Sequence, residues 1–81
     1  MLFIFPSSGR QSFWMKDTLI PLDMIWLDQH KRIVFIIPIV LPCETEKCPV
    51  YTPDVDAKYV LEVNAGVTAE LGLHVGDQAV F

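Results

Sequence analysis

The sequence predicts a mainly β domain with one short helix, either a sandwich or a partly open barrel. Of its 81 residues, 52% are apolar and only 20% are charged, a balance that excludes a disordered chain and a low-complexity chain. The length allows a single small domain. Six short apolar runs separated by turn residues, with only one helical turn, favour a sandwich or a barrel-like sheet.

The first half of the chain predicts four strands. The run 22–27 carries apolar residues on both sides of its alternation, as is typical of a central strand. The polar residues 28–31 predict a hairpin turn after it. Pro38 either ends the following strand or marks a bulge or an edge. We therefore expect strands over residues 2–5, 12–15, 22–27 and 32–37.

The second half predicts a long loop, a strand, a helical turn and a last strand. Residues 41–57 form a proline-rich loop with four acidic side chains, which we interpret as solvated. Residues 58–64 alternate, so Tyr59, Leu61 and Val63 are expected to be buried and the opposite face to be more polar. The remaining expectations are a short helix over 69–71 capped by Asn64 or Thr68, a stop at Gly72 and a strand over 78–81.

Charge and hydropathy exclude two classes of partner. The formal net charge is -4, the opposite of the balance that a non-specific nucleic-acid binder needs. The longest apolar stretch, residues 33–41, contains a proline and is far shorter than the ~20 residues of a membrane-spanning helix. We expect no nucleic-acid partner and no membrane span.

The two cysteines lie in the long loop and leave three interpretations open. Cys43 and Cys48 enclose four residues, so they can form a small disulfide or remain reduced thiols. A metal site would need His30, His74 or Met15 as further ligands, and the order of these residues is poor for zinc. We expect a disulfide and no metal.

Three charged residues lie beside or within apolar strands and form the candidate site. Lys16 can reach Asp23 or Glu62, and Trp14 and Trp26 can line a pocket around them. One interpretation is a ligand-binding pocket, in which Lys16 holds an anionic group. The other is structural: a buried ion pair that fixes strand register, or solvent-exposed charges, with both tryptophans in the core.

Apolar content exceeds what so short a chain can bury. A domain of this size buries roughly 60–65% of the surface of its unfolded chain. The nine aromatic residues and many aliphatic ones are more than its core easily holds. We therefore expect self-association, as a homodimer formed by strand pairing across a two-fold axis.

The chain contains FWMKDT at 13–18, IPLDMIWL at 20–27 and AKYVLEVNAG at 57–66, with shorter segments at 42–43, 48–51, 72–73 and 75–77. Together, these segments resemble the domain-of-unknown-function 192 family. This family implies a jelly-roll-like sandwich and no assigned activity. Its domain usually begins upstream with a further strand and a short helix, so residues 1–81 would be one domain shortened at its N-terminus. Many relatives carry signal sequences, which favours an exported location over the cytoplasm.

The function expected from these observations is a small non-enzymatic binding or accessory module. It would self-associate, bind a small-molecule ligand and need no cofactor. One alternative is a small enzyme that uses Lys16 with Asp23 or Glu62 as acid and base. Another is a metal-handling protein that uses Cys43, Cys48 and the histidines.

Overall fold

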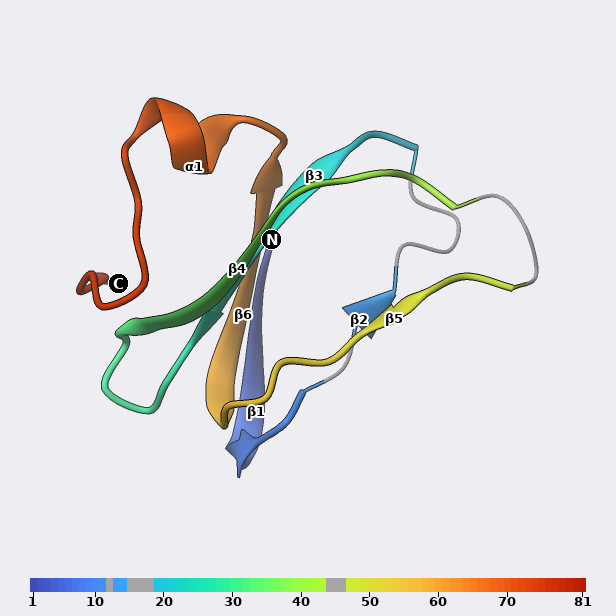
Figure 1. The fold of residues 1–81 in the computed structure, drawn as a ribbon. Helices are drawn as coiled ribbons and strands as arrows, with labels where there is room; N and C mark the ends of the chain where they lie inside the picture. Colours follow the sequence, from blue (N-terminus) through green and yellow to red (C-terminus); the bar gives the residue numbers. More distant parts are fainter. Residues whose placement is uncertain (12, 15–18, 44–46) are drawn as a thin grey trace.

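A four-stranded antiparallel sheet dominates the computed structural model, which describes residues 1–11, 13–14, 19–43 and 47–81 (Figure 1). Its strand order is β1-β6-β3-β4, and β2 and β5 form a separate two-stranded sheet. The predicted mainly β fold with one short helix is therefore confirmed. The elements are β1 (Leu2–Gly9), β2 (Phe13–Trp14), β3 (Leu22–Leu27), β4 (Ile33–Val40), β5 (Val50–Tyr51), β6 (Ala57–Asn64) and α1 (Val67–Glu70).

Strands β1 and β4 are the two edges of the large sheet, so within the described residues the sheet is open and does not close into a barrel. The jelly-roll arrangement implied by the resemblance stays a prediction. None of the helices in the described part of the chain is long and apolar enough to cross a membrane.

Strand β3 is central, as its two apolar faces predict. Met24 and Trp26 point to one face of the sheet and Ile25 and Leu27 to the other, and none of the four is more than 1% exposed. Its neighbours β4 and β6 pair with it in antiparallel register along its whole length. Burial on both faces explains why this strand shows no polar alternation beyond Asp23.

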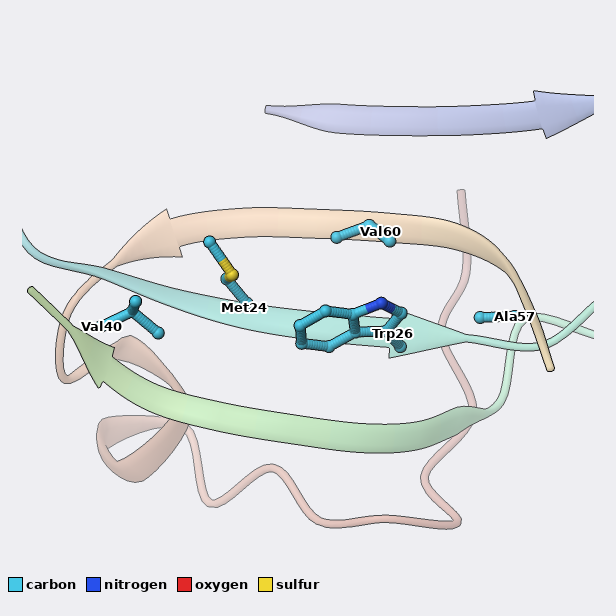
Figure 2. Packing of buried hydrophobic residues seen from close by; sticks show 5 residues of the cluster. All are labelled: Met24, Trp26, Val40, Ala57 and Val60. Atoms are coloured by element: carbon cyan, nitrogen blue, oxygen red, sulfur yellow. The ribbon is translucent and has the colours of Figure 1, made fainter. Parts of the chain in front are cut away.

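Different segments cover the two faces of the sheet. On the first face, Met24 and Trp26 pack with Val40, Ala57 and Val60, as Figure 2 shows. Partly buried side chains from β1, β3 and β4, together with Cys43 and Tyr51, complete this cluster. On the second face, the residues after α1 cover β3 and β4, so α1 and the C-terminal segment lie on the side opposite to β2 and β5 (Figure 1).

The hairpin between β3 and β4 is confirmed, but β4 is longer than expected. Asp28 Oδ1 accepts hydrogen bonds from the backbone N–H groups of His30 (2.8 Å) and Arg32 (3.0 Å), which shape the turn. The strand continues past Pro38 to Val40, because a one-residue register shift relative to β3 forms a bulge there and places Ile39 at φ 53°. The predicted bulge or edge at Pro38 is correct, and the predicted end at residue 37 is wrong.

Two further expectations are wrong. The face of β6 predicted to be polar contains Val60, which is 0% exposed, whereas Tyr59, Leu61 and Val63 are only half-buried. The reason is that the first face carries the larger core. Residues 78–81 do not form a strand, since only Gln78 makes a bridge, to Arg32.

Candidate functional site

Asp23 is a buried carboxylate at the junction of three segments of the chain. It lies in β3, is 0% exposed and accepts four hydrogen bonds. Its Oδ1 accepts from the backbone N–H groups of Ile39 (2.8 Å) and Gly66 (3.2 Å). Its Oδ2 accepts from the backbone N–H of Thr68 (3.0 Å) and from Thr68 Oγ1 (2.7 Å). The carboxylate therefore links three segments that are distant in sequence.

The start of α1 explains why a carboxylate is needed there. Gly66 occupies the N-cap position at φ 93°, and no side chain of the helix itself caps it. The expectation that Asn64 or Thr68 caps the helix is wrong, because Asp23 from the neighbouring strand accepts the free N–H groups instead. The expected stop at Gly72 is confirmed, since this residue follows the helix at φ 65°.

The environment of Asp23 keeps it ionised. Burial acts to raise the pKa of this carboxyl, but the hydrogen bonds from Ile39, Thr68 and Gly66 outweigh that cost and lower the pKa below 3.8. A buried charge stabilised by backbone donors is typical of a structural group. Because each of its two oxygens already accepts two hydrogen bonds, Asp23 has little capacity left to bind a ligand.

Glu62 lies on the opposite face of the sheet from Asp23. In the register of β3 and β6, Glu62 pairs with Met24, whereas Asp23 pairs with Val63. Burial raises the pKa of Glu62, and the positive charge of the N-terminus partly offsets this effect. Because Asp23 and Glu62 face opposite sides, one pocket cannot contain both carboxylates.

The two tryptophans and Lys16 complete the residues predicted for the site. Trp26 is 0% exposed; its Nε1 donates to the backbone carbonyl of Gln11 (2.9 Å), and its ring meets Phe35 edge-on at 5.4 Å. Trp26 therefore belongs to the core, and no open surface reaches it. Trp14 lies in β2, where its backbone pairs with Val50. Lys16 lies outside the described residues.

Cys43 and Cys48 form the predicted disulfide, with a Cα–Cα distance of 5.8 Å. Both sulfur atoms are bonded to each other, so neither is a thiolate available to a metal. In residues 1–11, 13–14, 19–43 and 47–81, no group of three His, Cys, Asp or Glu side chains is placed to hold a metal ion. Met15, the other ligand considered, lies outside these ranges.

A cleft of about 420 Å³ lies between β4 and the segment 68–75, which includes the end of α1 and the residues after it. One wall is formed by Ile36 and Pro38 of β4, and the other by Thr68, Ala69 and residues 72–75. The side chains of the lining residues are apolar apart from those of Thr68 and His74, and the Thr68 hydroxyl already donates to Asp23. Sequence reasoning missed this cleft, because its two walls come from segments thirty or more residues apart.

Asp23 holds both walls of this cleft. Ile39, which it binds through the backbone, directly follows the wall residue Pro38. Thr68, which it binds twice, is itself a wall residue. The one carboxylate therefore sets the separation between β4 and the start of α1.

Comparisons with known proteins extend over the whole chain. The model of the DUF192 family, described as "Uncharacterized ACR", matches residues 1–81. A crystal structure of a proposed transcription regulator from Sinorhizobium meliloti 1021 is 35% identical with a TM-score of 0.88, over 96% of this chain and 58% of that one. A protein of unknown function from Novosphingobium aromaticivorans DSM 12444 is 31% identical with a TM-score of 0.86, over 96% and 54%. The chain thus spans little more than half the length of these two structures. No curated protein matches.

Proposed function

Because the chain belongs to the DUF192 family, which is described as uncharacterized, we propose its function from the geometry: a non-enzymatic binding module whose ligand occupies the cleft beside β4. The cleft is the observation that carries this proposal. It is a cleft open to solvent, and its volume of about 420 Å³ lies near the lower end of the range of small-ligand sites. Apolar walls with one or two polar groups at the rim are the usual lining of such sites.

The arrangement of the carboxylates favours binding over acid–base catalysis. Asp23 is buried and accepts four hydrogen bonds, so it has no proton to donate and little room for a substrate. Glu62 is on the other face of the sheet. An enzyme built on Lys16 would therefore have to work with Glu62 without Asp23, away from the cleft.

The similarity to a proposed transcription regulator does not by itself suggest DNA binding by this chain. Its net charge of -4 opposes contact with a phosphate backbone. Its only described helix, α1, has four residues, too few to read a major groove. If the chain acts in regulation, we propose that it does so through contacts with other proteins.

Self-association through the edge of β1 is the second part of the proposal. Met1 and Glu62 exchange backbone hydrogen bonds (2.6 and 2.8 Å), so by alternation the backbone groups of Leu2 and Ile4 point away from β6. The segment from Leu2 to Phe5 carries no charge, and the Ile4 side chain is 65% exposed. An uncharged, apolar edge is well suited to antiparallel pairing with a second copy.

An exported location fits the disulfide. Disulfides persist in oxidising compartments and are rare in the reducing cytoplasm. The Cys43–Cys48 bond therefore supports a periplasmic or extracellular site of action. Trapping thiols with a maleimide in intact cells of the source organism tests this proposal, since modification of both cysteines before any reductant is added would contradict it.

Binding at the cleft is tested by titrating the protein with anilinonaphthalene sulfonate, a small aromatic probe. We expect saturable fluorescence enhancement in the native state, with shifts in the backbone amide signals of Ala69, Leu73 and Val75. Val75→Asp should weaken binding by about tenfold or more. Val80→Asp is the matched control, since Val80 is 95% exposed and lies outside the cleft.

Two results would contradict the proposal. One is a probe that binds without shifting any cleft amide. The other is equal weakening by Val75→Asp and Val80→Asp, which would place the probe elsewhere on the apolar surface. The fold of each variant is checked by its denaturation midpoint.

A further inference from the structure

We propose that the natural occupant of the cleft is a short, extended, apolar peptide segment of a protein partner, which adds to the open part of the β4 edge. This inference rests on the proposed function and names its ligand class. Strand addition to an exposed sheet edge is a recurring mode of peptide recognition. Three observations on β4 support it: the direction of its backbone groups, the use of the same edge by the C-terminal segment, and the apolar walls.

The backbone of Ile36 points out of the sheet. Glu62 directs its backbone N–H and C=O groups to β1. Because these groups alternate sides along a strand, the residues next to Glu62 bond to β3, and their register partners in β3 bond to β6. The remaining residues of β3, Met24 and Trp26, therefore direct their backbone groups to β4. Their register partners Ile37 and Phe35 therefore bond to β3. Ile36, between them, therefore directs its N–H and C=O away from β3, and Ile36 is also one of the residues that line the cleft.

The C-terminal segment already pairs with the beginning of this edge. Ile33 N–H donates to the carbonyl of Asp77 (2.9 Å), and Gly76 N–H donates to the carbonyl of Ile33 (2.7 Å). Arg32 and Gln78 continue this pairing as an antiparallel bridge. An edge that accepts one antiparallel segment at Ile33 has the geometry to accept another at Ile36.

The pairing ends where the cleft begins. Residues 72–75 leave the edge and form the outer wall of the cleft. Beyond Ile33, the residues that the structure describes give β4 no backbone partner other than β3, so no segment pairs with Ile36 on its outer side. A peptide entering here would continue the interface that residues 76–79 have begun.

The walls define the kind of peptide. Leu73 and Val75 face Ile36 and Pro38 across the cleft, and none of these side chains is charged, so small apolar side chains are favoured over charged ones. Pro38 has no N–H, so the edge offers no backbone donor at that position. The segment therefore gains its main-chain bonds at Ile36 and is short.

The test uses a capped peptide of alternating valine and threonine with a lysine at each end for solubility. Binding should shift the amide signal of Ile36 and slow its hydrogen exchange by about tenfold or more, because a new backbone bond protects it. The control peptide has the same side chains, but alternate backbone nitrogens are methylated, in two versions that block one edge or the other. Only the version that blocks the bonding edge should lose binding.

The outcomes separate this inference from the proposed function. The inference is overturned if both methylated peptides bind as well as the parent, or if Ile36 exchange is unchanged while anilinonaphthalene sulfonate still binds at Val75; the cleft is then a small-molecule site. If neither probe binds, the proposed function fails as well. Val75→Asp should weaken binding of the peptide by about tenfold or more relative to Val80→Asp. Equal effects of the two variants on peptide binding would contradict the placement of the peptide in the cleft.

Discussion

Thr68 donates two hydrogen bonds to the same oxygen of Asp23, one from its backbone N–H (3.0 Å) and one from its hydroxyl (2.7 Å). Thr68→Val keeps the shape of the side chain and removes the second bond. Because a hydrogen bond to a buried charge is worth about 1.5–3 kcal/mol, we expect a loss of that size in the free energy of unfolding. Urea denaturation measures it. Thr68→Ser retains the hydroxyl and should lose less than half as much; equal losses would contradict the role given to this bond.

Asp23→Asn tests the carboxylate itself. The amide nitrogen of asparagine would face N–H donors from Ile39, Gly66 or Thr68, and the charge that these donors stabilise would be gone. We expect a loss of about 2–4 kcal/mol, measured by urea denaturation. Asp54→Asn on the exposed loop is the matched control, with an expected change within about 0.5 kcal/mol. Similar small effects for both variants would mean that Asp23 is not a structural centre.

The pH dependence of stability follows from the two shifted carboxyls. The pKa of Asp23 is lowered below its ordinary 3.8, so its stabilising effect is complete above that pH and is lost as the pH falls through the lower folded value. Unfolding free energies of the wild type and Asp23→Asn should therefore converge on acidification from about pH 7 to about pH 2.5. A gap between them that stays constant would contradict the lowered pKa.

Glu62 should show the opposite sign. Its pKa is raised above 4.5, so the folded state binds a proton more readily than the unfolded state, and this residue's contribution falls as the pH rises through the window above 4.5. Glu62→Gln should be neutral or stabilising by under about 0.5 kcal/mol at neutral pH, because the side chain is partly solvated. Thermal denaturation at neutral and acidic pH measures the difference, and a clear loss at neutral pH would indicate an ionic contact of Glu62.

The disulfide should contribute to stability mainly by restricting the unfolded chain. Closing so short a loop is worth about 2 kcal/mol in the chain-entropy model. Cys43 also packs beside the buried cluster of Met24 and Val40, so its release loosens a covering segment. Denaturation midpoints with and without reductant should differ accordingly, and Cys43→Ala/Cys48→Ala should match the reduced wild type. A denaturation midpoint that is the same with and without reductant would contradict this contribution.

Ile4→Lys should abolish self-association without destabilising the monomer. A charged side chain at the centre of an apolar edge opposes pairing with an identical edge, since the two lysines would approach each other. Sedimentation velocity over a range of concentrations measures the oligomeric state. Leu71→Lys is the control, because its exposure (66%) nearly equals that of Ile4 (65%) and it follows α1 rather than lying in β1. A wild-type monomer at every concentration would contradict the dimer.

The elements of the fold that obey local rules could be predicted from the sequence. The bounds of β3, the hairpin at Asp28, the bulge beside Pro38 and the stop at Gly72 all follow from side-chain alternation or turn chemistry within a few residues. The Cys43–Cys48 bond was one of several interpretations and is confirmed.

The wrong or missed features depend on contacts between distant segments. The deeper burial of Val60 on β6 depends on the face that Cys43 and Tyr51 cover, which no alternation within β6 reveals. The role of Asp23 depends on donors from Ile39, Gly66 and Thr68, and the sequence showed only an acidic residue in an apolar run. The cleft was missed for the same reason: it exists only after the C-terminal segment has docked on β4.

The Pro38–Ile39 bulge and the start of α1 share the oxygens of one ionised group, and this has a consequence for motion. If either segment detaches alone, a charge and several backbone amides are left unsatisfied in a dry environment, which is costly. Partial openings that separate the two are thereby suppressed. The strand bulge, the central strand and the helix start therefore behave as one cooperative unit.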